Sequence, residues 1–241
     1  MEREIYERMA SHADRHWWFV ARRRILQTLI ARLRLPRGAR ILEVGCGTGH
    51  NIAMLRAFGD VEAVEADEAA RGFAREASGL PIGNGLLPEL NEVSDARYDL
   101  VALLDVLEHV DEDRASLRSI ARKLKPGGRL LLTVPAHPFL WSPHDEAHHH
   151  KRRYTKKALA GALRASGLRI DGLSYFNSFL FPLVLAARFA GKLLGKKEGD
   201  DAMPGRAANG LFERVFGLER HLVGRVPMPP GVSLVAVASR I

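Results

Sequence analysis

Two acidic side chains flank a glycine-rich stretch, and together they have the chemistry to bind a nucleotide-like ligand. Glu43 lies inside an apolar run, and Gly45, Gly47 and Gly49 follow it at alternate positions. Glycines there let the backbone approach a ligand closely, because a Cβ atom would block the approach. A carboxylate in a buried strand is costly unless something at the strand end needs it. Glu65 ends a second apolar run, where an acid can accept both hydroxyls of a ribose.

The elements that must position these residues alternate between strands and helices. Short apolar runs predict strands, and apolar residues at three-to-four spacing predict helices between them. Such alternation is typical of a parallel, doubly wound sheet, which binds ligands at the carboxyl ends of its strands. Asp105 lies at one of these ends. The predicted strands are 41–44, 61–66, 80–84, 98–105, 129–134, 168–175 and 231–238, with helices within 1–35 and at 50–58, 68–77, 112–124, 156–165 and 209–223.

The order of the glycines separates two ligands. The fingerprint of nicotinamide-binding folds is G-x-G-x-x-G, whereas this chain reads G-x-G-x-G from Gly45 to Gly49, and His50 takes the place of the third glycine. The stretch EVGCGTG instead resembles motif I of the class I S-adenosylmethionine (SAM) methyltransferases. Glu65, the run YDLVALLDVLEHV and the KPGG turn before LLLTVP match as well, so the resemblance covers about residues 38–175.

The resemblance implies a fold, a cofactor and a division into domains. The implied fold is a Rossmann-like, seven-stranded α/β sheet with N-terminal helices and a helical acceptor lid, and the cofactor is SAM. Within the family, the stretch DVLEHV is most similar to the ubiquinone-biosynthesis O-methyltransferases and their bacterial relatives. The implied domains are an N-terminal helical cover, the SAM-binding core, the acceptor lid and the last strand of the core sheet, at 1–36, 37–175, 176–228 and 229–241.

Carried over to this chain, the resemblance also implies contacts with the cofactor. Gly45 and Gly47 would lie under the methionine part of SAM. Glu43 would hold the amino group, directly or through water, and Glu65 would bind the ribose. Asp105, or the backbone beside it, would lie near the sulfonium.

Two further contacts concern the ends of the cofactor. Arg22 or Arg23 of the N-terminal helices would pair with the carboxylate of SAM. The third strand lacks the acid that usually meets the adenine amine, so Asn84 or a backbone amide is expected there. Between the two N-terminal helices we expect the stretch HWWF. Its adjacent residues Trp17 and Trp18 cannot share one helix face, so at least one should line a pocket or cap the core edge.

Methyl transfer is an in-line displacement, so alignment matters more than acid–base power. A hydroxyl acceptor also needs a base or a metal, whereas an amine needs little beyond desolvation. In the long loop 135–153 we expect His144 to act as this base, with the adjacent Asp145 fixing its tautomer. The alternative is that His144 only shapes the acceptor pocket.

No metal is expected, although one stretch is compatible with metal binding. Asp105, Glu108 and His109 are similar in order to an acid-x-x-Glu-His arrangement that some methyltransferases of the ubiquinone and small-RNA types use for a divalent ion. The run His148–His150 could add nitrogen ligands. In the family that the chain resembles, however, the Glu-His pair often occurs without metal.

Composition and charge limit the partners and the compartment. The chain has 241 residues, of which 46% are hydrophobic and 27% charged, and these proportions are those of a globular protein. The single cysteine, Cys46, and a charged N-terminus unlike a signal peptide favour the cytoplasm. The net charge of +8 favours an acidic partner, which would be nucleic acid, an anionic membrane or an acidic substrate.

Together these features predict methyl transfer to a small-molecule, lipid-linked or glycan-linked acceptor. The basic, apolar segment 176–194 adds peripheral contact with an anionic membrane at its inner face, because it is too short and too charged to span a bilayer. One alternative is an RNA methyltransferase or a basic RNA-binding module, although no base-methylation or basic–aromatic motif is present and no nucleic acid is expected. The other is a nicotinamide-dependent oxidoreductase. The acceptor, the methylated atom and the oligomeric state stay open.

Overall fold

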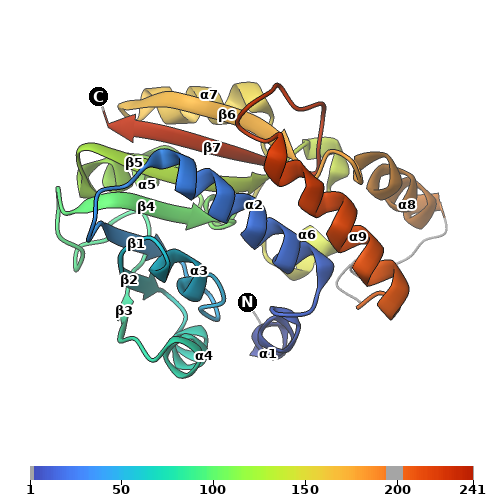
Figure 1. Ribbon diagram of the computed structural model, residues 1–241, viewed down its shortest axis with the longest axis horizontal. Helices are drawn as coiled ribbons and strands as arrows, with labels where there is room; N and C mark the ends of the chain where they lie inside the picture. The colour runs from blue at the N-terminus through green and yellow to red at the C-terminus, as the bar shows by residue number, and fades with distance from the viewer. Residues whose placement is uncertain (1–2, 194–202, 241) are drawn as a thin grey trace.

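Seven strands form the centre of the structure, a computed structural model that describes residues 3–193 and 203–240 (Figure 1). The strands are β1 (Arg40–Val44), β2 (Asp60–Glu65), β3 (Ile82–Asn84), β4 (Tyr98–Leu104), β5 (Leu124–Pro135), β6 (Leu168–Phe176) and β7 (Ser233–Arg240). They form one sheet in the order β3-β2-β1-β4-β5-β7-β6, in which β7 runs antiparallel to β5 and β6. The remaining neighbours are parallel, which confirms the predicted doubly wound, Rossmann-like sheet.

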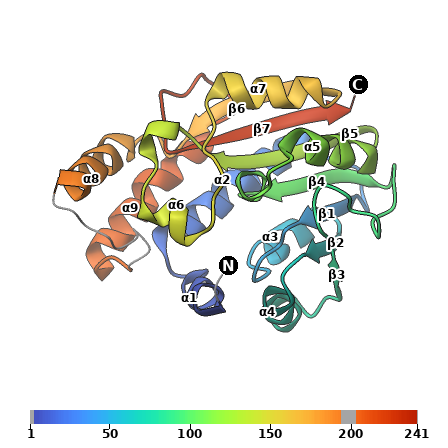
Figure 2. The ribbon, with the colours of Figure 1, turned by 180° about the vertical axis from the view of Figure 1, so that it is seen from behind.

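Helices cover both faces of this sheet. They are α1 (Arg3–His12), α2 (Trp17–Leu33), α3 (Ile52–Arg56), α4 (Glu68–Ser78), α5 (Asp113–Lys123), α6 (Pro143–Ala147), α7 (Lys156–Ala165), α8 (Phe181–Leu193) and α9 (Arg206–Leu218), with short 3-10 turns η1 (Leu107–His109), η2 (Pro138–Leu140) and η3 (Glu219–His221). Helices α2 and α9 cross the face turned toward the viewer in Figure 1. The reverse view shows α5 and α7 on the other face (Figure 2).

The central strands are apolar throughout because successive side chains of a strand point to opposite faces, and both faces are covered. In β1, Leu42 and Val44 pack in the hydrophobic cluster that includes α5 and α7. Ile41 packs in the second cluster, which includes α2 and α9. In β4, Val101 joins the first cluster and Ala102 the second. Continuous apolar runs therefore identify these strands in the sequence.

The N-terminal helices differ from the prediction at the two tryptophans. The stretch HWWF does not separate the helices, because His16 caps α2 by accepting a hydrogen bond from the Trp18 backbone N–H at 3.3 Å. The tryptophans therefore lie in the first turn of α2. Trp17 packs edge-on against Phe212 and Phe216 of α9. Both tryptophans line the cavity described below, as the prediction required of at least one.

Three other segments differ from the expected elements. The helix after the glycines is one short turn, α3, which starts at Ile52 rather than His50. The KPGG sequence lies within the long strand β5 instead of ending a helix before it. The loop 135–153 contains η2 and α6. Of the segment 176–194, residues 181–193 form α8, and residue 194 lies outside the described residues. Within residues 3–193 and 203–240, no helix is long and apolar enough to cross a membrane.

Candidate active site

A cavity of about 620 Å³ opens at the carboxyl ends of β1, β2, β4 and β5. Its volume lies in the range of sites that enclose a ligand of several hundred daltons. The glycine turn after β1, the first residues of α2, the turn η1 and the histidine-rich loop all contribute to its walls. The cavity therefore joins nearly all segments in which the sequence predicted functional residues.

The glycine turn leaves open space on the cavity side. Gly45 and Gly47 both have positive φ, at 70° and 55°, which side chains rarely adopt. A Cβ atom on Gly45 would lie 2.6 Å from a methyl group of Val106, so glycine is required there by packing. A Cβ on Gly47 would meet no atom within 4 Å, so it would project into unfilled space. The backbone at Gly47 is thus free to lie against a bound molecule.

Glu65 lies beside this turn, at the end of β2, and is oriented by two backbone N–H groups. Gly47 donates to its carboxylate at 2.8 Å, and Asp67 donates at 3.0 Å. A carboxylate has about four lone-pair sites, so acceptor capacity is left for two hydroxyls of a ligand. Asp67 also lines the cavity, but one of its oxygens caps α4 by accepting from the Ala70 N–H at 3.0 Å.

Arg22 and Asp105 form an ion pair in the floor of the cavity. A guanidinium nitrogen of Arg22, which is 1% exposed, lies 2.5 Å from a carboxylate oxygen of Asp105. The same guanidinium donates to the hydroxyl of Thr133 at 3.1 Å and lies 5.1 Å from the ring of Trp18. Arg23 does not line the cavity and pairs with Asp14 instead. Of the two arginines considered from the sequence, the structure brings only Arg22 to the site.

Glu43 lies behind the cavity wall and is hydrogen-bonded to Asn51, which lines the cavity. Its side chain is fully buried and does not line the cavity, but Asn51 donates a hydrogen bond to it at 2.9 Å. Burial raises the pKa of Glu43 to about 7. Asn51 lines the cavity and also accepts a hydrogen bond from Arg22 at 3.4 Å. No local sequence pattern marks Asn51, because its position between Glu43 and Arg22 depends on the fold alone.

Asn84 is exposed and does not line the cavity. Its side-chain oxygen accepts a hydrogen bond from Arg71 at 3.1 Å, and Arg71 also binds the backbone oxygen of Glu65 at 2.8 Å. The next residues, Gly85 and Leu86, line the cavity in its place. The structure therefore brings the neighbours of Asn84, and not its side chain, to the cavity.

The predicted pair of His144 and Asp145 is not formed. Asp145 is fully buried, and its carboxylate accepts from Arg153 at 2.7 Å and lies 2.9 Å from Nδ1 of His150. His144 instead packs against His148, with ring centroids 4.3 Å apart and ring planes tilted by 34°. The two residues are consecutive in α6, and consecutive residues of a helix do not face each other. Burial alone would raise the pKa of Asp145, but the bonds from His150 and Arg153 lower it below its usual value.

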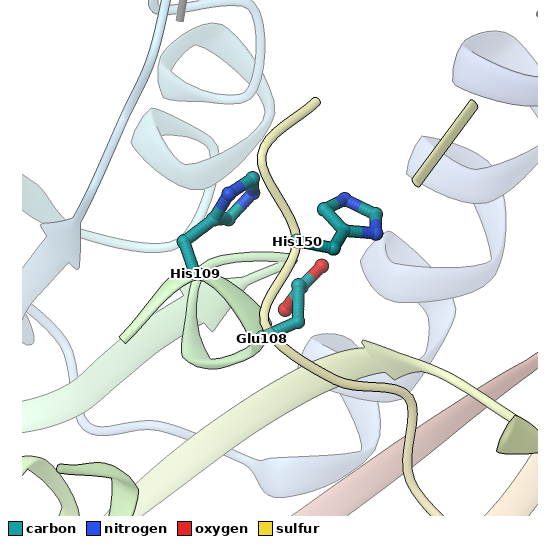
Figure 3. A group of neighbouring side chains, drawn as sticks. All are labelled: Glu108, His109 and His150. Atoms are coloured by element: carbon teal, nitrogen blue, oxygen red, sulfur yellow. The ribbon is translucent and has the colours of Figure 1, made fainter. Parts of the chain in front are cut away.

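Glu108, His109 and His150 converge at the edge of the cavity (Figure 3). One ligand atom from each lies within 4.8 Å of the other two. Glu108 and His109 belong to η1, and the histidine loop is joined to η1 where the Lys151 N–H donates to the Glu108 backbone oxygen at 2.7 Å. Burial and the charge of Asp105 raise the pKa of Glu108, whereas burial lowers the pKa of His109 to about 3. Among the residues that the structure describes, these three form the group that could hold a metal.

Comparison with known proteins identifies the family. The sequence pattern of the methyltransferase domain matches residues 18–172, and the chain therefore belongs to this methyltransferase family. It is 31% identical over 169 residues to the ubiquinone biosynthesis O-methyltransferase of Xanthomonas axonopodis pv. citri, a match that covers 62% of this chain and 70% of that protein. It is 36% identical over 104 residues to the mitochondrial enzyme of that name from Schizosaccharomyces pombe, covering 40% of this chain and 38% of the other.

Solved structures with the same fold support this assignment. A SAM-dependent methyltransferase of Thermotoga maritima, described as a possible histamine N-methyltransferase, has a TM-score of 0.58 at 20% identity over 99% of both chains. A protein from the complex of the Haloferax volcanii Trm112 methyltransferase activator with a methyltransferase has a TM-score of 0.62 at 19% identity, over 98% of this chain and 94% of the other. At these identities the likeness concerns the fold alone.

The protein is thus a SAM-dependent methyltransferase, and SAM is its cofactor. The residues present fit this cofactor. The open face at Gly47, the spare acceptor sites of Glu65 and the cation of Arg22 lie around one cavity. This assignment decides against the nicotinamide-dependent oxidoreductase that the glycines alone had left open.

Proposed function

We propose that the protein methylates a hydroxyl group of a small-molecule acceptor. The observation that carries the proposal is that one cavity is lined both by the glycine turn with Glu65 and by the histidine-rich loop with η1. The relative from Xanthomonas axonopodis pv. citri, 70% of which is covered by the match, is an O-methyltransferase. This supports oxygen as the methylated atom. A donor and an acceptor that share one cavity can be aligned for direct transfer.

Each residue of the cofactor half has a proposed role. SAM supplies a methyl group activated by a positively charged sulfonium. Glu65 accepts the ribose hydroxyls, and the backbone of Gly47 supports the methionine part. Asn51, which donates a hydrogen bond to the buried Glu43 behind it, forms the polar wall for the amino group, and Arg22 meets the carboxylate while it keeps its contact with Asp105.

The transfer itself breaks one bond and forms another. The acceptor oxygen forms a bond to the methyl carbon, the carbon–sulfur bond breaks, and its electron pair stays on sulfur, so that the sulfonium charge disappears. The proton of the acceptor hydroxyl passes to solvent. The residues His144, His148 and Val110 line the cavity on the acceptor side, and we assign them to shaping the acceptor pocket.

The first test is calorimetric titration with SAM, and separately with NADH and NADPH. We expect SAM to bind at micromolar concentration and the nicotinamides not to bind. Glu65→Ala should weaken SAM binding at least tenfold. Glu62→Ala is the matched control, because this acid of the same strand β2 pairs with Arg97 away from the cavity. Equal losses in both variants would contradict the role of Glu65.

The second test follows the methyl group. Protein supplied with SAM labelled in its methyl group is incubated with phenols and catechols, with the corresponding amines, and with RNA. We expect label in the phenols and catechols. Transfer to amines alone would overturn O-methylation, and transfer to RNA would restore the nucleic-acid alternative, whose binding should then weaken steeply with salt.

We also propose that a lipid-linked acceptor is reached at an anionic membrane surface. Large apolar side chains are exposed on the helices α8 and α9, namely Leu183, Phe189, Leu211 and Leu218. Arg214 is exposed between the two leucines of α9, so that face combines apolar and positive groups. Co-sedimentation with liposomes at low salt tests this contact. Binding to anionic liposomes and not to neutral ones is expected, and binding to neither would exclude it.

A further inference from the structure

Within the part of the chain that the structure describes, Glu108, which lies beside His109 and His150, has an unpartnered carboxylate oxygen that the proposed SAM contacts do not explain. One oxygen of the Glu108 carboxylate has no hydrogen-bond partner among the described residues, although the side chain is only 1% exposed. A buried carboxylate without a partner is costly unless a cation or a donor meets it. Figure 3 shows this carboxylate pointing toward the ring of His150, with His109 beside it. The missing partner would therefore lie among these three side chains.

The ring of His150 is held in a fixed orientation. Its Nδ1 lies 2.9 Å from Asp145, which is itself held by Arg153 at 2.7 Å and by the Ser142 N–H at 2.9 Å. Because Nδ1 is engaged by a carboxylate, Nε2 is the nitrogen that offers a lone pair to a ligand. A carboxylate that orients a histidine in this way is the arrangement that surrounds many histidine ligands of metals.

Asp105 is not part of this group. The sequence placed it first in an acid-x-x-Glu-His order, but its carboxylate lies against the guanidinium of Arg22. The third ligand atom comes instead from His150 in the loop that follows β5. This set of one carboxylate and two imidazoles differs from the sequence-ordered set, and it exists only when the loop is folded against η1.

We propose that Glu108, His109 and His150 bind one divalent transition-metal ion, and that Asp145 acts as a positioning residue through His150. Two imidazoles and one carboxylate favour zinc, manganese, iron or cobalt over magnesium, which prefers oxygen ligands. Three protein ligands leave coordination positions open, as in metal sites that act on a substrate. All three residues line the cavity, so these positions face the acceptor.

The consequence for the reaction rests on the proposed O-methylation. A divalent cation at this position would lower the pKa of an acceptor hydroxyl, so that its proton passes to solvent near neutral pH. The residues then need no separate base. Metal binding itself does not depend on that reaction, which allows the two proposals to be tested apart.

The experiment uses the full chain after chelation and removal of the chelator. Co²⁺ alone is titrated and followed both by calorimetry and by its visible absorption spectrum, and Zn²⁺ and Mg²⁺ are then added as competitors. We expect one equivalent of Co²⁺ to bind, Zn²⁺ to displace it and Mg²⁺ to compete poorly. His150→Ala and Glu108→Gln should each weaken binding at least tenfold.

Asp145→Asn separates the positioning role from the ligands. It should leave one Co²⁺ site with a changed absorption spectrum and an affinity about 10–100-fold lower. His221→Ala is the control for adventitious histidine binding, because His221 is exposed in η3 and does not line the cavity. It should leave Co²⁺ affinity unchanged. SAM titration of every variant checks that the cofactor half is still folded.

Each outcome decides a distinct question. If the wild-type chain binds no Co²⁺, or if His150→Ala and Glu108→Gln bind it as the wild type does while still binding SAM, the metal site is wrong. Full methyl transfer to phenols after complete metal removal would overturn the role of the metal in the reaction and favour His150 with Asp145 as a base. Tight Co²⁺ binding without transfer to any hydroxyl would support the site and refute the proposed acceptor.

Discussion

The guanidinium of Arg22 lies 2.5 Å from the carboxylate of Asp105, in the floor of the cavity. One residue comes from the second turn of α2, and the other directly follows β4 with a φ of 59°. The pair therefore links α2 to the carboxyl end of β4. Asp105 itself lines the cavity, so its predicted place near the sulfonium of SAM stays a prediction.

Removing one member of this pair should affect both stability and cofactor binding. Arg22→Met leaves a partly buried carboxylate without its cation, so we expect the free energy of unfolding to fall by about 3 kcal/mol. Urea denaturation measures this loss. The double variant with Asp105→Asn should recover part of it, because the uncompensated charge is gone. SAM affinity should fall at least tenfold in both proteins, and an unchanged affinity in Arg22→Met would assign Arg22 a purely structural role.

Gly47 allows a prediction with a closely matched control. Gly47→Ala adds a methyl group that projects into the open side of the glycine turn, whereas Gly127→Ala adds one at an equally open position in β5, outside the cavity. Both glycines have positive φ, so each substitution should cost about 1 kcal/mol of stability. Only Gly47→Ala should weaken SAM binding, by tenfold or more in calorimetry. Equal SAM affinities in the two variants would contradict contact between the cofactor and Gly47.

The raised pKa of Glu43 predicts a pH dependence of stability. Its native pKa of about 7 lies above its ordinary value of 4.5, so the folded chain holds this proton more tightly than the unfolded chain. The associated stability is fully present below about pH 4.5 and is lost as the pH rises toward 7, a change of up to about 3 kcal/mol.

Glu43→Gln removes this titration while it keeps an oxygen that can accept from Asn51. Its free energy of unfolding, relative to that of the wild type, should therefore increase between about pH 5 and about pH 8 in urea titrations without SAM. A difference that is independent of pH would show that Glu43 does not change its protonation over this range.

The hydrogen bonds of Asn209 join α9 to the start of α2, so its substitution should lower the stability of the folded chain. Its side-chain oxygen accepts from the Trp17 N–H at 2.9 Å, and its side-chain nitrogen donates to the Arg15 backbone oxygen at 2.8 Å. Asn209→Ala leaves both groups without this partner, so we expect a loss of about 1–3 kcal/mol. Asn209→Asp keeps the acceptor at a helix N-terminus and should lose less. Thermal unfolding of the two variants gives the comparison, and equal losses would refute the role of the acceptor.

The elements with local signals could be predicted from the sequence. Helix α7 begins after Thr155 because the Thr155 hydroxyl accepts from the Ala158 N–H, a bond between residues three apart. Strands β1 and β4 are continuous apolar runs, and their alternating side chains reach both clusters. The glycine turn and Glu65 form one unit because the strands that carry them are neighbours in the sheet.

The contacts that join distant segments could not be predicted in the same way. Adjacency in the sequence suggested that Asp145 orients His144, but the turn of α6 directs Asp145 to His150 and Arg153. Asn51 gave no sequence signal, since its importance comes from lying between Glu43 and Arg22. In each case the hydrogen-bond partner depends on how a loop folds or on how α2 packs against the sheet. Neither of these produces a local pattern in the sequence.

The position of β7 has a consequence for the order in which the molecule assembles. Strands β5 and β6 do not pair with each other, since β7 lies between them and pairs antiparallel with both. During synthesis these two strands leave the ribosome before their common partner, and only the arrival of residues 233–240 joins them in one sheet. Contacts between segments so far apart in the chain form slowly, and unpaired strand edges promote association between chains. A nascent chain that stalls before β7 should therefore depend on chaperones more than a chain in which β7 has been synthesised.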